Sequence, residues 1–414
     1  GYDQLGHWDA GKPRTTHQEF TDQGASRILW QNGSSAYHDH ATHTAGTMIA
    51  AGVVGSAKGM SYGGQLKSWE WSNDKSEMAA AAAQGLEISN HSYGTRRGWE
   101  YDNGNWSWYG TPSVAPLEDF RFGFYDSRSR ANDQIAYNAP NYLIIRSCGN
   151  DRGDGPSDAG QGDTPEKDGG DDGFDCIGQD EIAKNVLAVG AAYEVLNYTG
   201  PEDVRISSFS SWGPADDGRI KPDIVGKGVD VYSTYSGNNT DYSFSNGTSM
   251  SAPNIAGSCG LLQLHYRNLN GGPMRAATLK GLILHTADEA GPYPGPDYIF
   301  GWGLMNTKKA ANIISDNEGQ NSIDELVLED DDDYTRDVYV PEGTDELRVT
   351  ISWTDPAGLP VSSQLNPRDP MLVNDLDLKV LDPSRAVHFP YKLDPENPAN
   401  APTTDSENNV DNIE

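Results

Sequence analysis

Cysteine, positive charge and long apolar runs are all scarce in this chain of 414 residues. Only 30 lysines and arginines stand against 61 aspartates and glutamates, and the formal net charge of −31 argues against nucleic acids or anionic membranes as partners. No apolar run approaches the length of a membrane span and no signal peptide is visible, so we expect a soluble protein without a membrane span. Such an acidic composition is typical of secreted, salt-tolerant proteins and of proteins whose carboxylates bind calcium.

The three cysteines are too few for a disulfide framework. Cys148 and Cys176 flank a loop rich in glycine and aspartate, and the sequence leaves a disulfide between them and two free thiols equally open. Cys259 lies inside an apolar run, where we expect a buried free thiol.

Strands and helices alternate along the first three quarters of the chain. Apolar strands are predicted at 86–90, 142–145, 185–190 and 222–225, and helices at 76–84, 129–138, 255–264, 276–287 and 307–314. This alternation predicts an α/β fold, a doubly wound and mostly parallel sheet covered by helices on both faces. Ligands of such sheets bind beyond the carboxyl ends of the strands.

The sequence pattern changes after the last predicted helix. Residues 319–334 are acidic and indicate a linker, which would separate a first domain at 1–318 from a second at 335–414. In the second domain apolar and polar residues alternate at 337–340, 347–353 and 376–380, the period of antiparallel strands. We therefore expect a smaller all-β sandwich that stops without a final strand and is incomplete.

Four polar residues fall where predicted elements begin or end. Asp9 closes a short strand, His40 opens a helical run, and Asn150 follows a strand. Ser249 precedes the apolar run at 255–264, near a helix N-terminus whose free N–H groups and dipole favour a developing anion. A serine there is also a common helix cap, so this residue alone does not decide the function.

Together these four residues have the composition of a hydrolytic site. A serine hydroxyl becomes a good nucleophile when a histidine takes its proton and a carboxylate orients that histidine. An amide donor must also stabilise the oxyanion. The order Asp9, His40, Ser249 along the chain is that of subtilisin, and differs from the orders of chymotrypsin and the α/β-hydrolases.

The chain resembles the subtilisin-like serine peptidases, the subtilase or S8 family, over roughly residues 1–315. Three blocks in the family's order carry the resemblance: Asp9-Ala10-Gly11, His40 to Thr47, and Gly247 to Pro253. Ala41 and Thr44 replace the usual glycine and valine of the histidine block, and neither change removes a catalytic group. Residues 335–414 are similar to the C-terminal jelly-roll domain of some bacterial subtilases.

The resemblance implies a secreted serine endopeptidase, made as a zymogen with its own pro-segment and acting as a monomer on proteins or peptides. It assigns the nucleophile to Ser249, the base to His40, the orienting carboxylate to Asp9 and the oxyanion donor to Asn150. Substrate would pair with one wall of the pocket for the P1 residue, which precedes the scissile bond, and face a second wall. The first wall is Ser92, Tyr93 and Gly94, and the second is Ser147, Cys148 and Gly149. No charge lies in these walls, so a broad or apolar P1 preference is expected.

Other assignments of the same residues are weaker. His38, His40 and His43 together could suggest zinc, but no His-Glu-x-x-His motif is present and the serine block would go unexplained. His43 is expected to pack in the interior, and Asp39 to point away from the site. The rival functions are a non-catalytic subtilase-like binding protein, which would show a broken triad, and an esterase, which would show another triad order.

Calcium is the expected cofactor, in a structural role. The loop at 151–175 offers many carboxylates without the spacing of an EF-hand, and a solvated acidic surface is an equally open interpretation of it. The candidate ligands are Asp171, Asp172 and Asp175 in this loop, and Asn374, Asp375 and Asp377 in the second domain.

Overall fold

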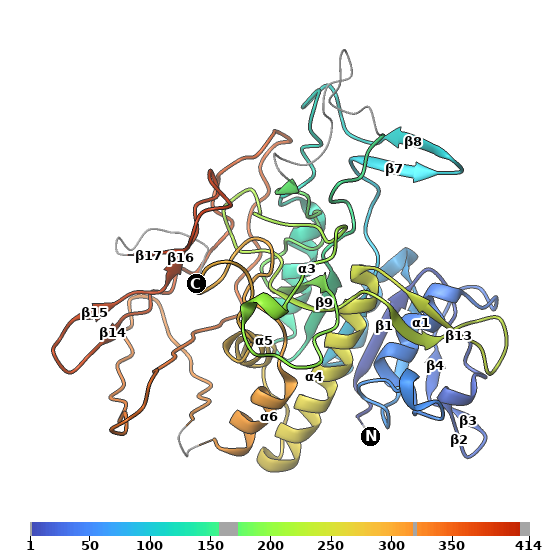
Figure 1. Ribbon diagram of the computed structural model, residues 1–414, viewed down its shortest axis with the longest axis horizontal. Helices are drawn as coiled ribbons and strands as arrows, with labels where there is room; N and C mark the ends of the chain where they lie inside the picture. Colours follow the sequence, from blue (N-terminus) through green and yellow to red (C-terminus); the bar gives the residue numbers. More distant parts are fainter. Residues whose placement is uncertain (1, 157–172, 318–320, 406–414) are drawn as a thin grey trace.

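A parallel sheet of seven strands forms the centre of a computed structural model that describes residues 2–156, 173–317 and 321–405 (Figure 1). The strand order is β11-β10-β9-β6-β1-β5-β4, and every neighbouring pair is parallel. The strands are β1 (Leu5–Asp9), β4 (Ile28–Trp30), β5 (Leu66–Glu70), β6 (Ile88–His91), β9 (Leu143–Ser147), β10 (Val186–Ala192) and β11 (Ile224–Lys227).

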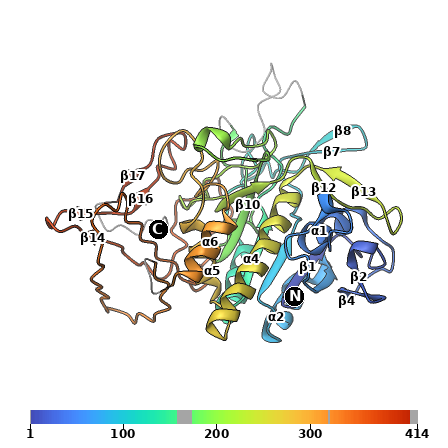
Figure 2. The same ribbon diagram turned by 60° about the horizontal axis from the view of Figure 1, so that its bottom comes forward.

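Helices cover both faces of this sheet. They are α1 (Asp39–Ile49), α2 (Asp74–Ala83), α3 (Ser127–Asn138), α4 (Thr248–Asn270), α5 (Ala276–His285) and α6 (Thr307–Ser315). Helices α1, α4, α5 and α6 lie on one face, where α4 crosses β6, β9, β10 and β11 (Figure 2). Helices α2 and α3 pack on the other face. The predicted doubly wound α/β fold is thus confirmed.

Alternating side chains of the buried strands divide the core into two layers. Leu143 and Ile145 of β9 belong to the cluster under α4, whereas Ile144 belongs to the cluster under α2 and α3. Strands buried on both faces read as continuous apolar runs, because neither side of the pleat meets water. This is why the sequence pattern located the central strands well.

Three neighbouring strands deliver polar residues to one edge of the sheet. Asp9 is the last residue of β1, Ser92 follows the last residue of β6, and Ser147 is the last residue of β9. In the sheet these strands lie in the order β9-β6-β1, so their carboxyl ends are adjacent. Helix α4 begins at Thr248, so Ser249 lies in its first turn.

Short antiparallel strand pairs and 3₁₀ helices lie around the central sheet. The pairs β2 (Thr21–Asp22) with β3 (Ala25–Ser26), β7 (Trp99–Asp102) with β8 (Asn105–Trp108) and β12 (Val231–Thr234) with β13 (Tyr242–Ser245) are antiparallel. Short 3₁₀ helices lie at Gln18–Phe20, Gly55–Ala57, Trp71–Asn73 and Pro201–Asp203. The β7–β8 hairpin projects clear of the body in Figure 1. In the described parts of the chain no helix is both long and apolar enough to span a bilayer.

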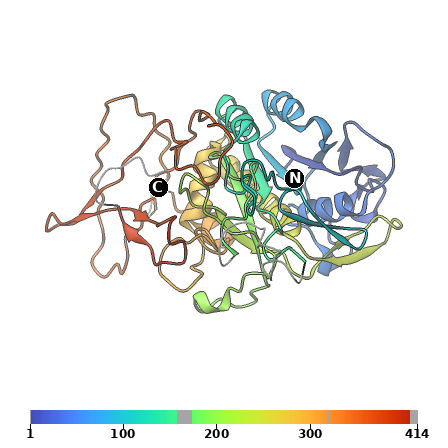
Figure 3. The same ribbon diagram turned by 90° about the horizontal axis from the view of Figure 1, so that it is seen from above.

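The C-terminal region forms a lobe beside the sheet domain, orange to red in Figure 3. Its strands are antiparallel, as expected, but short: β14 (Val380–Leu381) pairs with β15 (Val387–His388), and β16 (Tyr391–Lys392) with β17 (Thr403–Thr404). The strands expected at 337–340 and 347–353 were wrong: these residues pair with no strand, and they are exposed to solvent except for the half-buried Ile351 and Trp353. The proposed domain boundaries stay a prediction.

A buried lysine attaches the C-terminal lobe to the sheet domain. The Nζ of Lys184 forms an ion pair with Asp355 and donates to the carbonyl oxygens of Pro356 and Met371, both at 2.6 Å. The neighbouring Asn185 donates to the Asp355 carbonyl oxygen at 2.8 Å and accepts from its N–H at 2.9 Å. These contacts bring residues far apart in sequence into one interface.

All three cysteines are free and buried. Of the two alternatives that the sequence left open for Cys148 and Cys176, the structure therefore has the two free thiols and no disulfide. The Sγ of Cys148 is directed to the Ser211 carbonyl oxygen at 3.3 Å, whereas the Sγ of Cys176 accepts from the Trp212 N–H at 3.2 Å. Cys259 is a buried free thiol, as predicted.

Candidate active site

The carboxylate of Asp9 holds the imidazole of His40. Asp9 is fully buried at the end of β1, and His40 is the second residue of α1, with its side chain 30% exposed. The Nδ1 of His40 lies 2.8 and 2.9 Å from the two carboxylate oxygens of Asp9. With Nδ1 engaged, Nε2 is the ring nitrogen left to accept a proton, the arrangement required of a general base.

Two further side chains fix the carboxylate of Asp9. The hydroxyl of Thr44 donates to Asp9 Oδ2 at 3.0 Å, and the Nε2 of His7 lies 2.8 Å from that hydroxyl and 3.5 Å from Asp9 Oδ2. Sequence reasoning missed both roles. The signal was nevertheless present, because Thr44 is four residues after His40 on a helix and His7 is two residues before Asp9 on a strand, so each shares a face with its partner.

Burial and pairing act in opposite directions on this pair. Burial disfavours the ionised carboxylate, yet the charge and hydrogen bond of His40 hold the pKa of Asp9 well below its usual value. Burial likewise disfavours the imidazolium, but Asp9 raises the pKa of His40 above its ordinary value of 6.5. The Asp9 carboxylate therefore stabilises the protonated form of His40, which is the form that a general base takes after it accepts a proton.

Ser249 lies in the first turn of α4 and is tied to the strand end of β6. Its Oγ donates to the Ser92 carbonyl oxygen at 3.2 Å, and the Ser92 hydroxyl donates to the Ser249 carbonyl oxygen at 2.9 Å. That carbonyl is available because Pro253, four residues later, has no N–H to donate to it. The proline thus frees a backbone acceptor that locks the nucleophile segment against β6.

Two N–H donors converge beside Ser249. The Oδ1 of Asn150 accepts from the N–H and the hydroxyl of Thr248, both at 2.9 Å, which fixes the amide with Nδ2 on its other side. A Cβ on Gly247 would lie 3.7 Å from Asn150 Nδ2 and 3.6 Å from the Ser249 nitrogen. These two donors border the same small space, and Gly247 keeps it open.

The six residues expected to form substrate walls lie at the ends of β6 and β9, which are hydrogen-bonded neighbours. Gly94 is exposed, whereas Ser147 and Cys148 are buried. The side chain of Tyr93 is turned to α2, where its hydroxyl donates to Asp74 Oδ2 at 2.9 Å, so only its backbone is available to a substrate.

The six wall residues carry no charge, but a charged side chain from outside this set lies against both walls. The guanidinium of Arg97 sits there, with Nη1 3.1 Å from the position of a Cβ on Gly94 and Nη2 2.9 Å from that of a Cβ on Gly149. Arg97 is three residues beyond Gly94 in sequence, inside a segment without periodicity, and nothing in the sequence indicated that its side chain returns to the wall.

The family model of the subtilases, described as the Subtilase family, matches residues 12–303. This chain belongs to that family. The match confirms the family expected from the three blocks.

Curated relatives of this subtilase match different shares of its length. It is 52% identical to a C5a peptidase of Streptococcus pyogenes serotype M3 over 84 residues, 20% of this chain and 7% of the relative. Pyrolysin of Pyrococcus furiosus is 29% identical over 166 residues, 34% of this chain and 12% of pyrolysin. Subtilisin DY of Bacillus licheniformis is 26% identical over 297 residues, 70% of this chain and 83% of that protein. The matches thus span only a small part of the first two relatives.

Solved structures agree on the fold of the subtilase. The protease domain of PatA, solved as a point mutant, has a TM-score of 0.51 and 18% identity, and the match covers 76% of this chain and 96% of that one. A lanthipeptide protease has a TM-score of 0.51 and 17% identity, with 76% and 87% covered. At such identities the likeness is one of fold.

His43 and Asp39 are bonded to groups other than Asp9 and Ser249, although His38 and Asp39 line the same cavity as His40. His43 is buried, and its Nε2 lies 2.9 Å from the Val231 carbonyl oxygen, while burial lowers its pKa to about 4. Asp39 accepts from the Ser236 hydroxyl. Among the residues that the structure describes, no three His, Cys, Asp or Glu side chains group as metal ligands, so the zinc interpretation has no support there.

The candidate calcium ligands differ in their surroundings. Asp171 and Asp172 lie outside the described residues. Asn374, Asp375 and Asp377 are exposed. Asp175 is buried, and its Oδ1 has no hydrogen-bond partner in the described structure. Of the described candidates, Asp175 is thus the buried one, and Asp216, which the sequence did not indicate, is also buried with carboxylate oxygens unpartnered within the described residues.

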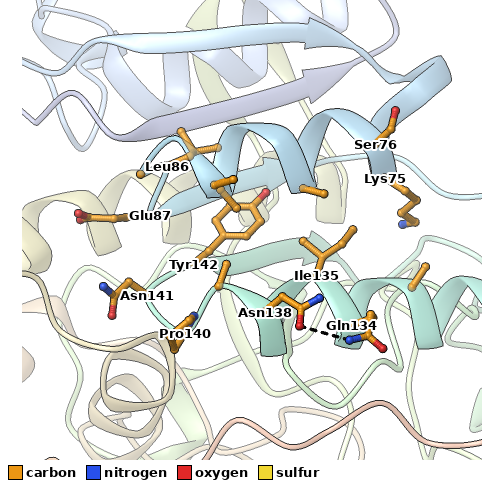
Figure 4. A pocket seen from close by; sticks show the side chains of 16 residues that line it. Lys75, Ser76, Leu86, Glu87, Gln134, Ile135, Asn138, Pro140, Asn141 and Tyr142 are labelled. Atoms are coloured by element: carbon orange, nitrogen blue, oxygen red, sulfur yellow. Dashed lines mark hydrogen bonds between the residues drawn. The ribbon is translucent and has the colours of Figure 1, made fainter.

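Two pockets in the described part of the chain differ in their lining residues. A cavity of about 580 Å³ is lined by His40, Asn150 and Ser249, together with residues around the starts of α1 and α4 and after β12. The other, of about 800 Å³, lies between α2 and α3 (Figure 4). Glu87 and Tyr142 in its lining immediately precede β6 and β9, so this groove borders the amino ends of the strands, away from the edge that carries Asp9.

Proposed function

We propose that this subtilase is an endopeptidase in which Ser249 attacks the scissile carbonyl and His40 takes its proton. The observation that carries the proposal is the fully buried Asp9 carboxylate, 2.8 Å from the Nδ1 of His40, which itself lines one pocket together with Ser249 and Asn150. A binding protein with a decayed site would have no reason to keep this buried charge paired so closely.

The first chemical step is acyl transfer to Ser249. Its Oγ rotates from the Ser92 carbonyl oxygen towards His40, loses its proton to Nε2, and bonds to the carbonyl carbon of the substrate. His40 then gives that proton to the leaving amine, and the C–N bond breaks. Asp9 keeps Nδ1–H oriented and stabilises the imidazolium between these two transfers.

The second requirement is a place for the oxyanion. Nδ2 of Asn150 and the N–H of Ser249 would donate to it, aided by the positive end of the α4 dipole. In the closing step His40 takes a proton from water, whose oxygen bonds to the acyl carbon; the bond from that carbon to the Oγ of Ser249 then breaks, and His40 returns the proton to Oγ. Substrate would lie extended along Ser92, Tyr93 and Gly94, using their backbone groups.

Removing the nucleophile tests this proposal. Ser249→Ala should reduce cleavage of a protein substrate such as casein by roughly 10⁶-fold, the scale of nucleophile loss in subtilisin itself. Ser127→Ala, an exposed serine at the start of α3, is the matched control and should cleave at the wild-type rate. Equal cleavage by wild type and Ser249→Ala, with melting temperatures also equal, would mean that another group is the nucleophile.

We also propose that calcium binds structurally at Asp175 and Asp216. Both side chains are buried, and Oδ1 of Asp175 and both carboxylate oxygens of Asp216 lack partners among the described residues. A Cβ on Gly123 would lie 2.7 Å from Asp175 Oδ1 and 2.3 Å from Asp216 Oδ1, so these oxygens face one small space. Orphaned, buried oxygens of like charge suit a hard cation.

The bound cation would neutralise charges that otherwise repel. Burial and the charge of Glu118 raise the pKa of Asp175, and burial together with the charge of Asp175 raises the pKa of Asp216. The positive charge of Arg368, from the C-terminal lobe, acts in the opposite direction on both carboxyl groups. The exposed residues at 374–377 offer no orphaned buried oxygen, so they fit the ion less well.

We further propose that the protein is secreted, is synthesised with a pro-segment and acts as a monomer. The family resemblance and the net charge of −31 support them. Expression of the full-length gene in its own host, followed by N-terminal sequencing of protein from the medium and sedimentation analysis, tests all three. Protein found only inside the cells, an uncleaved N-terminus, or a stable dimer would each remove the corresponding part.

A further inference from the structure

Three glycines surround the side chain of Arg97. Its guanidinium lies 3.1 Å from the position of a Cβ on Gly94 and 2.9 Å from that of a Cβ on Gly149. On Gly178 a Cβ would collide with the guanidinium carbon at 2.2 Å. A side chain at Gly178 would meet Arg97 alone, whereas one at Gly94 would also meet Glu181 and one at Gly149 would first meet Asp151 and Ser211. The three glycines therefore border a slot that Arg97 fills together with the carboxyl groups that hold it.

Charged and polar partners anchor Arg97 in this slot. Its Nη2 donates to Asp151 Oδ2 at 3.1 Å, its Nη1 lies 3.9 Å from Glu181 Oε2, and its Nη1 also donates to the Thr95 carbonyl oxygen at 3.1 Å. The side chain is only 3% exposed. Moving the guanidinium out of the slot would be costly, because the carboxyl groups of Asp151 and Glu181 would then lose their positively charged partner.

The position of the slot relates it to the scissile bond. Gly149 immediately precedes Asn150, the proposed oxyanion donor, and Gly94 is two residues beyond Ser92, which bonds to Ser249. A substrate extended along Ser92 to Gly94 would direct the side chain of its P1 residue between these two walls. The pocket beside Ser249 does not include Gly94 or Gly149 in its lining, which agrees with a filled slot.

We infer that Arg97 is a specificity-determining residue that closes the P1 pocket, so that this subtilase cleaves after small residues such as glycine, alanine and serine. The inference rests on the proposed endopeptidase function and narrows its substrate class. Bulky apolar P1 residues are rejected because their side chains would need the volume of the guanidinium.

The charges around Arg97 argue against an acidic P1 residue. One guanidinium faces two carboxyl groups, Asp151 and Glu181, so the slot holds no surplus positive charge to attract a third. Its one nitrogen without a hydrogen-bond partner in the described structure, Nε, lies beside Gly178. A basic P1 residue would have to displace Arg97 itself to reach the carboxylates.

The test is a set of peptides that differ only in the P1 residue. With wild-type protein, kcat/KM for P1 alanine should exceed that for P1 phenylalanine by at least about 100-fold, the scale of discrimination by steric exclusion in a pocket. Arg97→Ala should raise kcat/KM for P1 phenylalanine by about 10-fold or more and change that for P1 alanine far less. A preference for phenylalanine, aspartate or lysine in wild type would overturn the inference.

Two further variants keep the test decisive. Arg96→Ala removes the same charge from an exposed neighbour that pairs with Asp102, and its P1 profile should equal that of wild type. If Arg97→Ala fails to fold because Glu181 is left unpaired, Arg97→Ala/Glu181→Gln removes that charge and should show the same opened pocket. An unaltered P1 profile in a folded Arg97 variant would contradict the inference.

The failure of this inference can be told from failure of the proposed function. A fluorophosphonate that labels Ser249 in a protein cleaving only after large residues would leave the endopeptidase intact and remove the role of Arg97. Absence of both labelling and cleavage of every peptide in the set would instead remove the proposed function, and the inference with it.

Discussion

At the residue scale, the proposed mechanism makes activity depend on the protonation of His40. It requires neutral His40, and Asp9 raises the pKa of His40 above 6.5. We therefore expect kcat/KM to rise with pH through an apparent pKa above that value. Below it His40 is protonated and cannot accept the proton of Ser249.

Removing the carboxylate tests that cause. Asp9→Asn should lower kcat by roughly 10⁴-fold and move the acid limb of residual activity to lower pH, because the carboxylate no longer stabilises the imidazolium. The pH profile of kcat/KM measures the shift. An acid limb that stays in place would show that Asp9 does not set the pKa of His40.

Asn150 offers a second prediction at this scale. Asn150→Ala should lower kcat by about 10² to 10³-fold with little change in KM, because Nδ2 would donate only to the transition state; this magnitude was measured in subtilisin itself. Steady-state kinetics on one peptide separates the two constants. A rise in KM with unchanged kcat would assign Asn150 to ground-state binding of substrate.

Sequence motifs predicted individual site residues only where the chemistry requires a particular residue type at a particular spacing. The blocks around Asp9, His40 and Ser249 could be recognised because each chemical role admits few side chains. Thr44 was expected to be a neutral replacement for valine, yet its hydroxyl bonds to Asp9 at 3.0 Å. Arg97 was missed because its role depends on how an irregular segment folds back on the strand ends.

At the element scale, the backbone conformation of Gly247, just before α4, leaves room beside the proposed oxyanion donors. Gly247 has φ of +147°, a conformation that side chains rarely adopt, and a Cβ there would stand 3.6 Å from the Ser249 nitrogen. Gly247→Ala should therefore cost about 1–2 kcal/mol of folding free energy and lower kcat at least about 10-fold. Thermal melting and kinetics measure the two effects.

The other end of the same helix provides the control. Gly271, at the C-cap of α4, has φ of +78° and open space where a Cβ would be. Gly271→Ala should show a comparable loss of stability with wild-type kcat. Equal losses of activity in both variants would mean that general destabilisation, and not obstruction of the oxyanion donors, explains the effect at Gly247.

Element prediction succeeded where burial alone imposes the pattern. The sequence located β9, β10 and α4 because strands buried on two faces and a long core helix have strong apolar signatures. It failed at 337–340 and 347–353, where alternation of apolar and polar residues is present but no paired strand accompanies it. Pairing depends on partners distant in sequence, which local periodicity does not report.

At the scale of the whole molecule, the proposed calcium site joins the sheet domain to the C-terminal lobe. Arg368 donates to the Asp216 carbonyl oxygen at 2.7 Å. Chelation should lower the melting temperature of wild type by several degrees. Asp216→Asn should lose this response and melt higher than chelated wild type, because one of the repelling charges is gone. Asp330→Asn, an exposed control, should respond as wild type does.

The buried pair Lys184–Asp355 gives a further prediction at this scale. Lys184→Ala leaves Asp355 buried without its cation, and we expect a loss of about 3–5 kcal/mol at this interface. Limited proteolysis should then cut residues 321–352 faster than in wild type. Lys308→Ala, an exposed lysine of α6, should leave the rate unchanged. Unaltered proteolysis of the Lys184 variant would show that the lobe is held by other contacts.

The site of covalent modification by a serine-directed probe tests whether Ser249 is the nucleophile. A fluorophosphonate should add a single phosphonyl group, located by peptide mass analysis on Ser249 and absent from both His40→Ala and Ser249→Ala. The same preparation should lose peptide cleavage in proportion to labelling. Labelling of a different residue, or full cleavage by protein whose Ser249 is completely phosphonylated, would contradict the assignment of Ser249 as the nucleophile.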